Sequence, residues 1–262
     1  MLGRRPCPTG PGRLTPFSLP SSSQPQQKIE TPSAALPILA LLLAGAALPL
    51  PAQNSKAEFW PELAIYANRG EILRFVFVDS FDQDQSNRNQ QGEFAYYVDI
   101  ALKPVFRREL RQRGDVFRRR YLTFRAGYQY TTTFVPGNPD SENRIIAEST
   151  SRYHLGAGFV ASDRNRGEFR WIKGKPFSMR YRNRLTIERD CRVHGFGFTP
   201  FVYGEAYYDT RYAAWNRNRI AFGVQIPAGV HMRVDPYLAR QEDTRATPRY
   251  VHALGLTWNL FF

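Results

Sequence analysis

Residues 251–262 read VHALGLTWNLFF, and this stretch decides the fold class. Its even-numbered positions hold large, mostly apolar side chains, namely His252, Leu254, Leu256, Trp258, Leu260 and Phe262. Its odd-numbered positions hold residues that are mostly small or polar, namely Val251, Ala253, Gly255, Thr257, Asn259 and Phe261. A period of two is that of a β-strand, whose successive side chains point to opposite faces. The stretch therefore predicts a strand with two chemically distinct faces, ending on an aromatic residue.

This strand resembles the terminal strand of bacterial outer-membrane barrels, in which apolar residues alternate up to a final Phe. In such proteins the barrel-assembly machinery reads the terminal strand. The resemblance implies a membrane-insertion signal made of Leu254, Leu256, Trp258, Leu260 and Phe262. It also implies a location in the bacterial outer membrane, with outer-membrane lipid and the assembly machinery as partners.

The amino-terminal region carries the pattern of an export signal. Residues 36–50, LPILALLLAGAALPL, form an apolar run with the length of a secretory h-region. The run is shorter than the roughly 20 residues that a membrane helix needs, and Pro37 and Pro49 disfavour a continuous helix. Basic residues precede it, and Leu-Pro-Ala before Gln53 offers a small-residue cleavage site. We expect residues 1–52 to be a signal peptide with a long disordered n-region, and residues 53–262 to form a single outer-membrane β-barrel domain.

Two other interpretations of this region stay open. Translation could start downstream of Met1, which would shorten the n-region. The pair Arg4-Arg5 would fit a twin-arginine signal, but it lies far from the apolar run. The arrangement therefore favours export through the Sec pathway.

The charge of the chain points to anionic partners. The sequence holds 36 Lys and Arg against 23 Asp and Glu, a formal net charge of +13. Removing residues 1–52 takes away four basic residues and one acidic residue, which leaves 32 against 22, or about +10. Such a surplus favours nucleic acid or anionic surfaces. Because the arginines recur at alternate positions within strands, we expect rows on one sheet face and no binding to nucleic acid. Only Cys191 remains after the cleavage, so no intramolecular disulfide can form.

Alternation and turn residues predict eleven strand segments. They are 59–66, 71–80, 93–106, 119–132, 143–154, 162–172, 177–190, 198–209, 215–226, 229–240 and 250–262. Most are long enough to cross a membrane at a tilt, and longer polar connections alternate roughly with tight ones. Since single-chain bacterial barrels have even strand numbers, we expect an all-β, antiparallel, up-and-down transmembrane β-barrel of twelve strands. The twelfth would lie near residues 107–117; ten strands would result if the first two segments formed one bent strand.

The polar faces of these strands carry the candidate functional residues. Arginines and carboxylates recur there at every second position, and neighbouring strands would pair them across the sheet. The predicted lumen-lining residues are Arg144, Glu148, Arg152, Arg164, Arg166, Glu168, Arg170, Arg180, Arg182, Arg184, Glu188, Glu205, Asp209, Arg217, Arg219, Arg233 and Asp235.

The alternation alone would also fit a soluble two-sheet sandwich with its charged face in solvent. The export signal, the strand lengths, the terminal Phe and the aromatic residues near strand ends favour the barrel. The aromatic residues expected in interfacial girdles are Trp60, Tyr66, Tyr130, Trp171, Trp215 and Trp258.

A family resemblance indicates the same fold. It is carried by the runs SDRNRGEFRWI (162–172), YRNRLTIERD (181–190), WNRNRIAFGV (215–224) and the final strand. These runs resemble the outer-membrane barrels grouped as domain-of-unknown-function family 2490, and the resemblance covers most of residues 59–262. It implies a β-barrel in the outer membrane and no established activity.

Motifs for enzyme chemistry are weak in this sequence. It contains no GxSxG, no HExxH and no phosphate-cradling glycine loop. The four histidines are scattered without carboxylate spacing, so we expect no metal site and no cofactor. A lipid-modifying enzyme would use Ser149, Ser151 and His154, but Ser151 and His154 have opposite parity along their strand.

Two functions of different classes remain open, with that enzyme as a third alternative. The arginine rows predict a narrow channel or a lumen binding site that favours small anionic solutes. Long arginine side chains could instead fill a narrow barrel, which would give a non-conducting structural or assembly barrel with a salt-bridged interior. The sequence leaves the oligomeric state open.

Overall fold

A computed structural model describes residues 54–84, 90–105, 115–134 and 140–262 of the chain. The described residues all belong to one compact unit, within residues 34–262. The predicted signal peptide, residues 1–52, and the cleavage site lie outside the described residues.

The described residues form long β-strands with very little helix. The strands are β1 (Ser55–Arg69), β2 (Leu73–Asp84), β3 (Gln90–Val105), β4 (Arg120–Thr133), β5 (Ser141–Gly156), β6 (Phe159–Ile172), β7 (Ser178–Arg189), β8 (Cys191–Val193), β9 (Phe196–Asp209), β10 (Ala214–Pro227), β11 (Met232–Asp243) and β12 (Tyr250–Phe261). A short 3-10 helix, η2 (Val116–Arg119), precedes β4. The eleven long strands coincide with the eleven predicted segments, because alternating patterns of this length specify strands. Across the described ranges, no helix is long and apolar enough to span a membrane.

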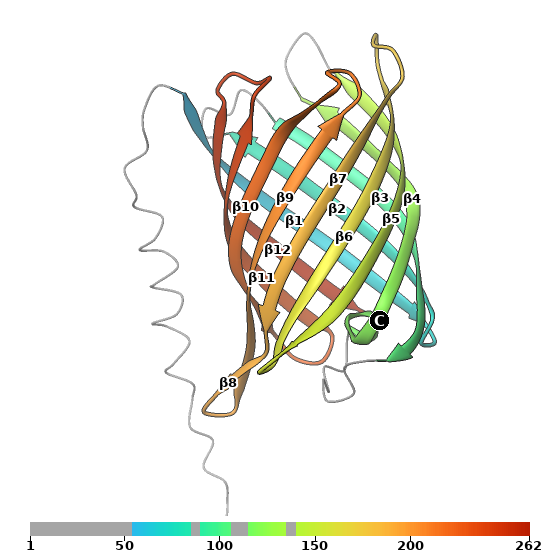
Figure 1. Cartoon of the computed structure of the whole chain (residues 1–262), viewed down its shortest axis with the longest axis vertical. Helices are drawn as coiled ribbons and strands as arrows, with labels where there is room; N and C mark the ends of the chain where they lie inside the picture. The colour runs from blue at the N-terminus through green and yellow to red at the C-terminus, as the bar shows by residue number, and fades with distance from the viewer. Residues whose placement is uncertain (1–53, 85–89, 106–114, 135–139) are drawn as a thin grey trace, which may run out of the picture. The chain divides into compact units, whose positions relative to one another are not determined.

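Eleven strands close into a barrel (Figure 1). Each long strand pairs with its neighbour in sequence, β7 pairs with β9, and β12 returns to pair with β1. The seam between β1 and β12 is parallel, with Ser55 opposite Tyr250 and Tyr66 opposite Phe261. In a ring with an odd number of strands, not every neighbouring pair can be antiparallel. One parallel pair is therefore required, and here it is β1 with β12.

The predicted all-β barrel and the count of twelve strands are confirmed, but the twelfth strand lies elsewhere. It is β8, a three-residue strand in a hairpin with β9, outside the ring. At the predicted place, residues 116–119 form η2, and residues 107–114 lie outside the described residues. Because β1 and β2 are separate antiparallel strands, the ten-strand alternative is wrong.

The barrel has two different rims (Figure 1). Strands β1, β5 and β10 end in tight turns at one rim, which we call the turn rim; β12 ends there as well. Strands β6, β9 and β11 end at the opposite rim, the loop rim, where β1 begins. The β5–β6 turn needs left-handed backbone, which Gly156 (φ 83°) and Gly158 (φ 79°) adopt without a side-chain clash.

The outer face of the wall is apolar and the inner face is polar. Large side chains project outward along the strands; Ile220 is 63% exposed and Leu185 is 52% exposed. The predicted insertion-signal residues Leu254, Leu256, Trp258 and Leu260 share the outer face of β12, and Phe262, directly after the strand, is exposed. Ala253, Asn259 and Phe261 of the same strand are buried on the inner face.

The aromatic residues divide between the two faces, which corrects part of the sequence interpretation. Trp171 and Trp215 are exposed near the loop rim, and Trp215 packs edge-on against Tyr181 and Tyr208. Trp60, by contrast, is buried inside the barrel, and Tyr66 stacks on the inward-facing Phe261 with ring centroids 4.9 Å apart. Both lie on the even, inward face of β1, so Trp60 and Tyr66 cannot belong to an outer girdle.

Gly127 of β4 lies directly against the backbone of β3. A Cβ atom at this position would stand 2.2 Å from the backbone oxygen of Tyr96 on β3. We expect Gly127→Ala to destabilise the barrel by roughly 1–3 kcal/mol, because a backbone oxygen cannot move away. Gly204→Ala on β9 is the matched control, since a Cβ atom there would have no other atom within 4 Å. Urea unfolding midpoints of the two variants would measure the difference; equal midpoints would contradict the close approach.

Candidate functional site: an arginine-lined cavity inside the barrel

The interior is organised by carboxylates that several arginines share. Glu205 of β9 is the clearest case. Its side chain accepts from Arg164 at 2.6 Å, from Arg184 at 2.8 Å and from Arg182 at 3.0 Å. The Tyr207 hydroxyl donates to the same carboxylate at 2.9 Å. Charge-assisted hydrogen bonds of this kind are among the strongest in proteins, so Glu205 ties together three strands.

Two further carboxylates extend this lattice along β6, β7 and β9. Glu168 is fully buried and lies 2.9 Å from Arg182 and 3.2 Å from Arg166. Asp209 lies 2.7 Å from Arg170 and 3.3 Å from Arg180. The arginine rows are therefore bound to the wall by the carboxylates of neighbouring strands.

A second cluster fixes the segment that carries η2 inside the turn rim. Asp115 lies 2.9 Å from Arg74 of β2 and 3.3 Å from Arg233 of β11. The buried ring of Phe117 packs against Arg74, with the guanidinium carbon 4.2 Å from the ring centroid. Arg118 reaches across to Glu188 at 3.1 Å. These contacts join the segment to three strands that are far apart in the sequence.

The electrostatics of Asp115 follow from these contacts. Burial raises the pKa of the carboxyl, but the neighbouring guanidinium groups of Arg74, Arg233 and Arg118 outweigh burial and lower the pKa to about 2. Asp115 is therefore an anion at neutral pH and holds its segment by charge.

A cavity of about 440 Å³ lies between these clusters, inside the barrel. Among the described residues, ten arginines and four carboxylates line it. The arginines are Arg125, Arg144, Arg164, Arg166, Arg180, Arg182, Arg184, Arg217, Arg219 and Arg233, and the carboxylates are Glu62, Asp82, Glu93 and Asp235. The carboxylates that neutralise most of these arginines, such as Glu168 and Glu205, lie behind them in the wall. The surface that faces the cavity is consequently cationic.

Arg219 of β10 differs from the other arginines of the cavity. It donates to the side-chain oxygen of Gln241, at 2.7 Å and 3.2 Å, and has no carboxylate partner among the described residues. Its guanidinium carbon lies 4.4 Å from the ring centroid of Trp60. A neutral amide and an aromatic face position the guanidinium without neutralising it, so Arg219 keeps its charge available to a ligand.

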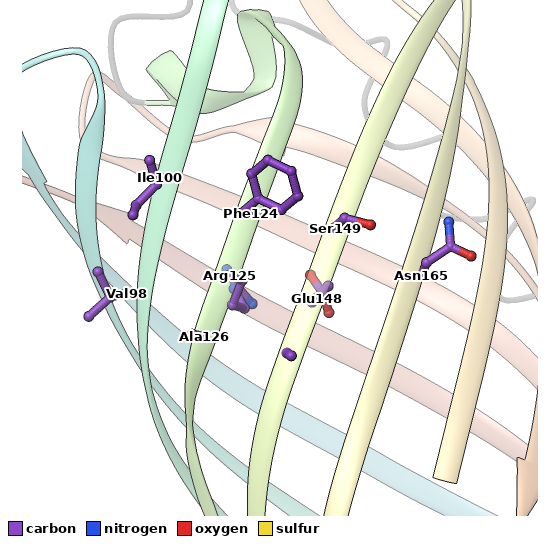
Figure 2. Close-up of a pocket in the computed structure, with 9 residues that line it drawn as sticks. Val98, Ile100, Phe124, Arg125, Ala126, Glu148, Ser149 and Asn165 are labelled. Carbon is purple, nitrogen blue, oxygen red and sulfur yellow. The ribbon is translucent and has the colours of Figure 1, made fainter.

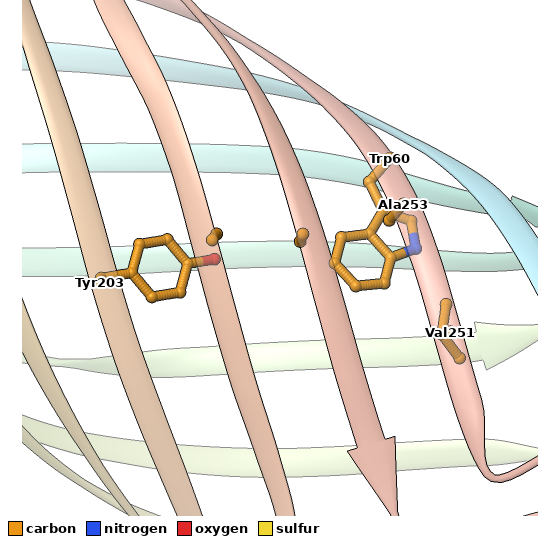
Figure 3. Packing of buried hydrophobic residues seen from close by; sticks show 6 residues of the cluster. Trp60, Tyr203, Val251 and Ala253 are labelled. Atoms are coloured by element: carbon orange, nitrogen blue, oxygen red, sulfur yellow. The ribbon is translucent and has the colours of Figure 1, made fainter. Parts of the chain in front are cut away.

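An aromatic patch completes the cavity wall where β9–β12 meet β1. Trp60 of β1 and Tyr203 of β9 share a buried cluster with Ala221, Ala239, Val251 and Ala253, which lie on the strands between them. Figure 3 shows Trp60 beside Ala253. Tyr237 lies flat on Gly255, where a Cβ atom would stand only 2.0 Å from the ring. Small residues under large rings let the rings lie along the wall, which leaves space in the lumen.

The structure places all seventeen predicted lumen residues on the inner face. Ten of them line the cavity: Arg144, Arg164, Arg166, Arg180, Arg182, Arg184, Arg217, Arg219, Arg233 and Asp235. The other seven are held in the wall or near the rims: Glu148, Arg152, Glu168, Arg170, Glu188, Glu205 and Asp209. Most of these seven are the partners that hold the cavity arginines in place.

Sequence reasoning missed the contribution of β1–β4 to the site. Glu62, Asp82, Glu93 and Arg125 line the cavity, although none of them belongs to a row of alternating charges. The alternation within β1 would have predicted an inward Glu62, because Glu62 shares one face of the strand with Trp60 and Ala64, which are both buried. Tyr203, Tyr207 and Tyr237 also line the cavity and were not predicted to do so.

A second hollow, of about 370 Å³, lies on the outer face of β3–β6. Val98, Ile100 and Phe124 flank it, and Ser149 and Asn165 lie at its polar end (Figure 2). The side-chain oxygen of Asn165 accepts a hydrogen bond from the side-chain amide of Asn183 at 3.1 Å, so this oxygen already has a partner within the protein. Arg125 and Glu148 also line the hollow, at positions of inward parity, so its outward-facing lining is mostly apolar.

The residues considered for lipid chemistry do not converge. Ser149 and Ser151 lie on the outer face of β5, whereas His154 has inward parity at the turn rim, where its Nδ1 accepts from the Gly156 amide. No group of three or more His, Cys, Asp or Glu side chains could hold a metal ion in the part of the chain that the structure describes.

Comparison with known proteins gives a family. Residues 87–252 match the family described as Protein of unknown function (DUF2490). No curated protein matches the chain.

Glu205 gives a direct test of the buried lattice. Glu205→Gln removes one negative charge shared by three arginines, and we expect a loss of roughly 3–5 kcal/mol, because the buried guanidinium charges lose their compensation. Asp140→Asn is the control, since Asp140 pairs with Lys175 at 3.4 Å on the exposed surface; we expect a change of roughly 0–1 kcal/mol. Urea unfolding would measure both, and a small effect of Glu205→Gln would refute the shared-carboxylate arrangement.

The segment at Asp115 should respond to acid. The pKa of Asp115 is lowered from 3.8 to about 2, so the ionised carboxylate stabilises the folded barrel by about 2 kcal/mol. This stabilisation is complete above pH 3.8 and is lost as the pH falls toward 2. We expect hydrogen exchange in residues 115–120, corrected for intrinsic rates, to increase over that range. Asp115→Asn should show the increased exchange at every pH. A wild-type exchange rate that does not change with pH would contradict the role of this carboxylate.

Proposed function

The chain belongs to the family Protein of unknown function (DUF2490), and we propose that it is an integral β-barrel of the bacterial outer membrane whose lumen binds small anionic solutes. The proposal has two parts, a location and a ligand class. Each rests on a different face of the barrel wall.

The location is supported by the outer face. Exposed apolar side chains run around the wall, for example Tyr96, Ile145, Ile220 and Phe222. A surface of this extent is unfavourable in water and matches the lipid-facing band of outer-membrane barrels. Hydrocarbon chains would cover it, including the apolar hollow of β3–β6. The partners in this setting are outer-membrane lipid and, during assembly, the barrel-assembly machinery.

The ligand class is supported by one observation above all, the cationic surface of the cavity. Ten arginines face the space with four carboxylates among the described residues, and Arg219 lacks a carboxylate partner there. Guanidinium groups bind carboxylates and phosphates through paired hydrogen bonds. Because the protein around the cavity has a lower dielectric constant than bulk water, the attraction to an anion is stronger there than at an open surface.

A non-conducting structural barrel is the second candidate, and the segment at residues 115–119 favours it. This segment is bound inside the turn rim through Asp115 and Arg118. The arginine lattice also fills much of the remaining lumen. A barrel of this kind would hold a ligand without letting it pass, or would bind none.

Arg219 provides the binding test. We expect the purified barrel in detergent to bind 3-phenylpropionate in isothermal titration calorimetry, and Arg219→Gln to weaken binding about tenfold or more, because a charge-assisted hydrogen bond is lost. Arg249→Gln is the control, since Arg249 is exposed and pairs with Glu242 away from the cavity; it should bind like the wild type. Absence of binding by the wild type, or equal binding by both variants, would overturn the ligand class.

Two further measurements separate the remaining alternatives. Recordings in a planar bilayer should give an anion-selective reversal potential for a channel; a silent bilayer with intact binding would favour the closed barrel. Cell fractionation should recover the protein with outer membranes. Recovery in a periplasmic extract without detergent would refute the location.

A further inference from the structure

We infer that the lumen ligand is amphoteric: a small solute of amino-acid type, with a carboxylate, an ammonium group and an apolar part. This inference rests on the proposed anion binding and adds two features to it. The first is a carboxylate patch on one side of the cavity, in which Glu62 and Asp82 have no ion-pair partner among the described residues, and the second is the aromatic patch beside it.

The carboxylates of Glu62 and Asp82 line the cavity without a partner of opposite charge. Neither forms an ion pair or a hydrogen bond with another described residue, whereas nearly every cavity arginine is bound to a carboxylate. Glu93, in the same patch, lies 3.4 Å from Arg144. Both side chains are half-buried. A carboxylate in such a place is stabilised by a cation or a hydrogen-bond donor, and the described residues supply neither to Glu62 and Asp82.

The positive and negative groups of the cavity are segregated. Three of the four carboxylates lie on β1–β3, and nine of the ten arginines lie on β4–β7 and β10. In the order of the ring, β2 is separated from β7 by four strands on one side and by five on the other, so the two strands face each other across the lumen (Figure 1). An electric field therefore points across the cavity, from the arginine wall to the carboxylate wall.

This field selects among charged solutes. A simple anion gains contacts with Arg219 but is repelled by the opposite wall, and a simple cation has the reverse problem. A solute with both charges satisfies both walls at once and aligns its dipole with the field. The segregation thus favours an amphoteric molecule over either singly charged relative.

The aromatic patch indicates where the apolar part of the ligand lies. Trp60 joins the two charged walls: Glu62 is two residues further on β1, and Arg219 stacks on the indole ring at 4.4 Å. Tyr203 and Tyr237 continue the patch beside it. A volume of about 440 Å³ falls in the range of small-molecule sites and accommodates a single amino acid with a large side chain.

Three matched probes test the inference by titration calorimetry. L-Phenylalanine carries both charges, 3-phenylpropionate lacks the amine, and phenethylamine lacks the carboxylate. We expect the wild type to bind L-phenylalanine about tenfold more tightly than either singly charged probe, since one charge-assisted contact is added. Equal or tighter binding of 3-phenylpropionate would overturn the amphoteric ligand and leave the anion site standing. Absence of 3-phenylpropionate binding would overturn the proposed function itself, whether or not L-phenylalanine binds.

A charge-removing variant locates the amine. Glu62→Gln combined with Asp82→Asn should bring L-phenylalanine binding down to the level of 3-phenylpropionate, whose own affinity should stay equal or rise. Glu242→Gln, on a carboxylate paired with Arg249 outside the cavity, should leave the preference unchanged. If the double variant does not fold, Glu62→Gln alone and the wild-type probe comparison decide. A preserved preference in a folded variant would refute the assignment of Glu62 and Asp82.

Discussion

Charges enclosed by a closed sheet have to be compensated within it, and the interior of this barrel depends on that constraint. Glu168 and Glu205 each meet several arginines from neighbouring strands. A shared carboxylate compensates several guanidinium groups and restricts their side chains together. The wall thus carries its arginines in fixed positions, and the cavity surface inherits both their charge and their order.

The chemistry of the lumen follows from the way this compensation is distributed. Behind the arginine wall, carboxylates are plentiful and paired. On β1 and β2, Glu62 and Asp82 have no such partners among the described residues. The charges that line the cavity are therefore polarised from one side to the other. A polarised site discriminates between solutes of equal net charge, which a uniformly cationic site cannot do.

The sequence predicted the strands and the arginine rows because both depend on local alternation. Every second residue is charged over 164–170 of β6 and 180–184 of β7, so parity alone placed Arg166 and Arg182 inside. The parallel seam and the place of β8 could not be predicted, since strand closure depends on contacts between distant segments. The carboxylate wall was missed because Glu62 is flanked on its own face by the uncharged Trp60 and Ala64, so it does not continue a row of charges. Trp60 was misplaced because position near a strand end was given more weight than its shared parity with Glu62.

The parallel seam between β1 and β12 has a topological consequence. Ser55 pairs with Tyr250, whereas the Asn68 amide donates to the carbonyl of Phe262 at the other rim. The first and last strands therefore begin together and end together, and residues 55 and 262 are separated by the length of a strand. Epitopes inserted beside these two residues would report opposite sides of any bilayer that the barrel crosses. A circular permutant would need a linker that traverses the full height of the wall.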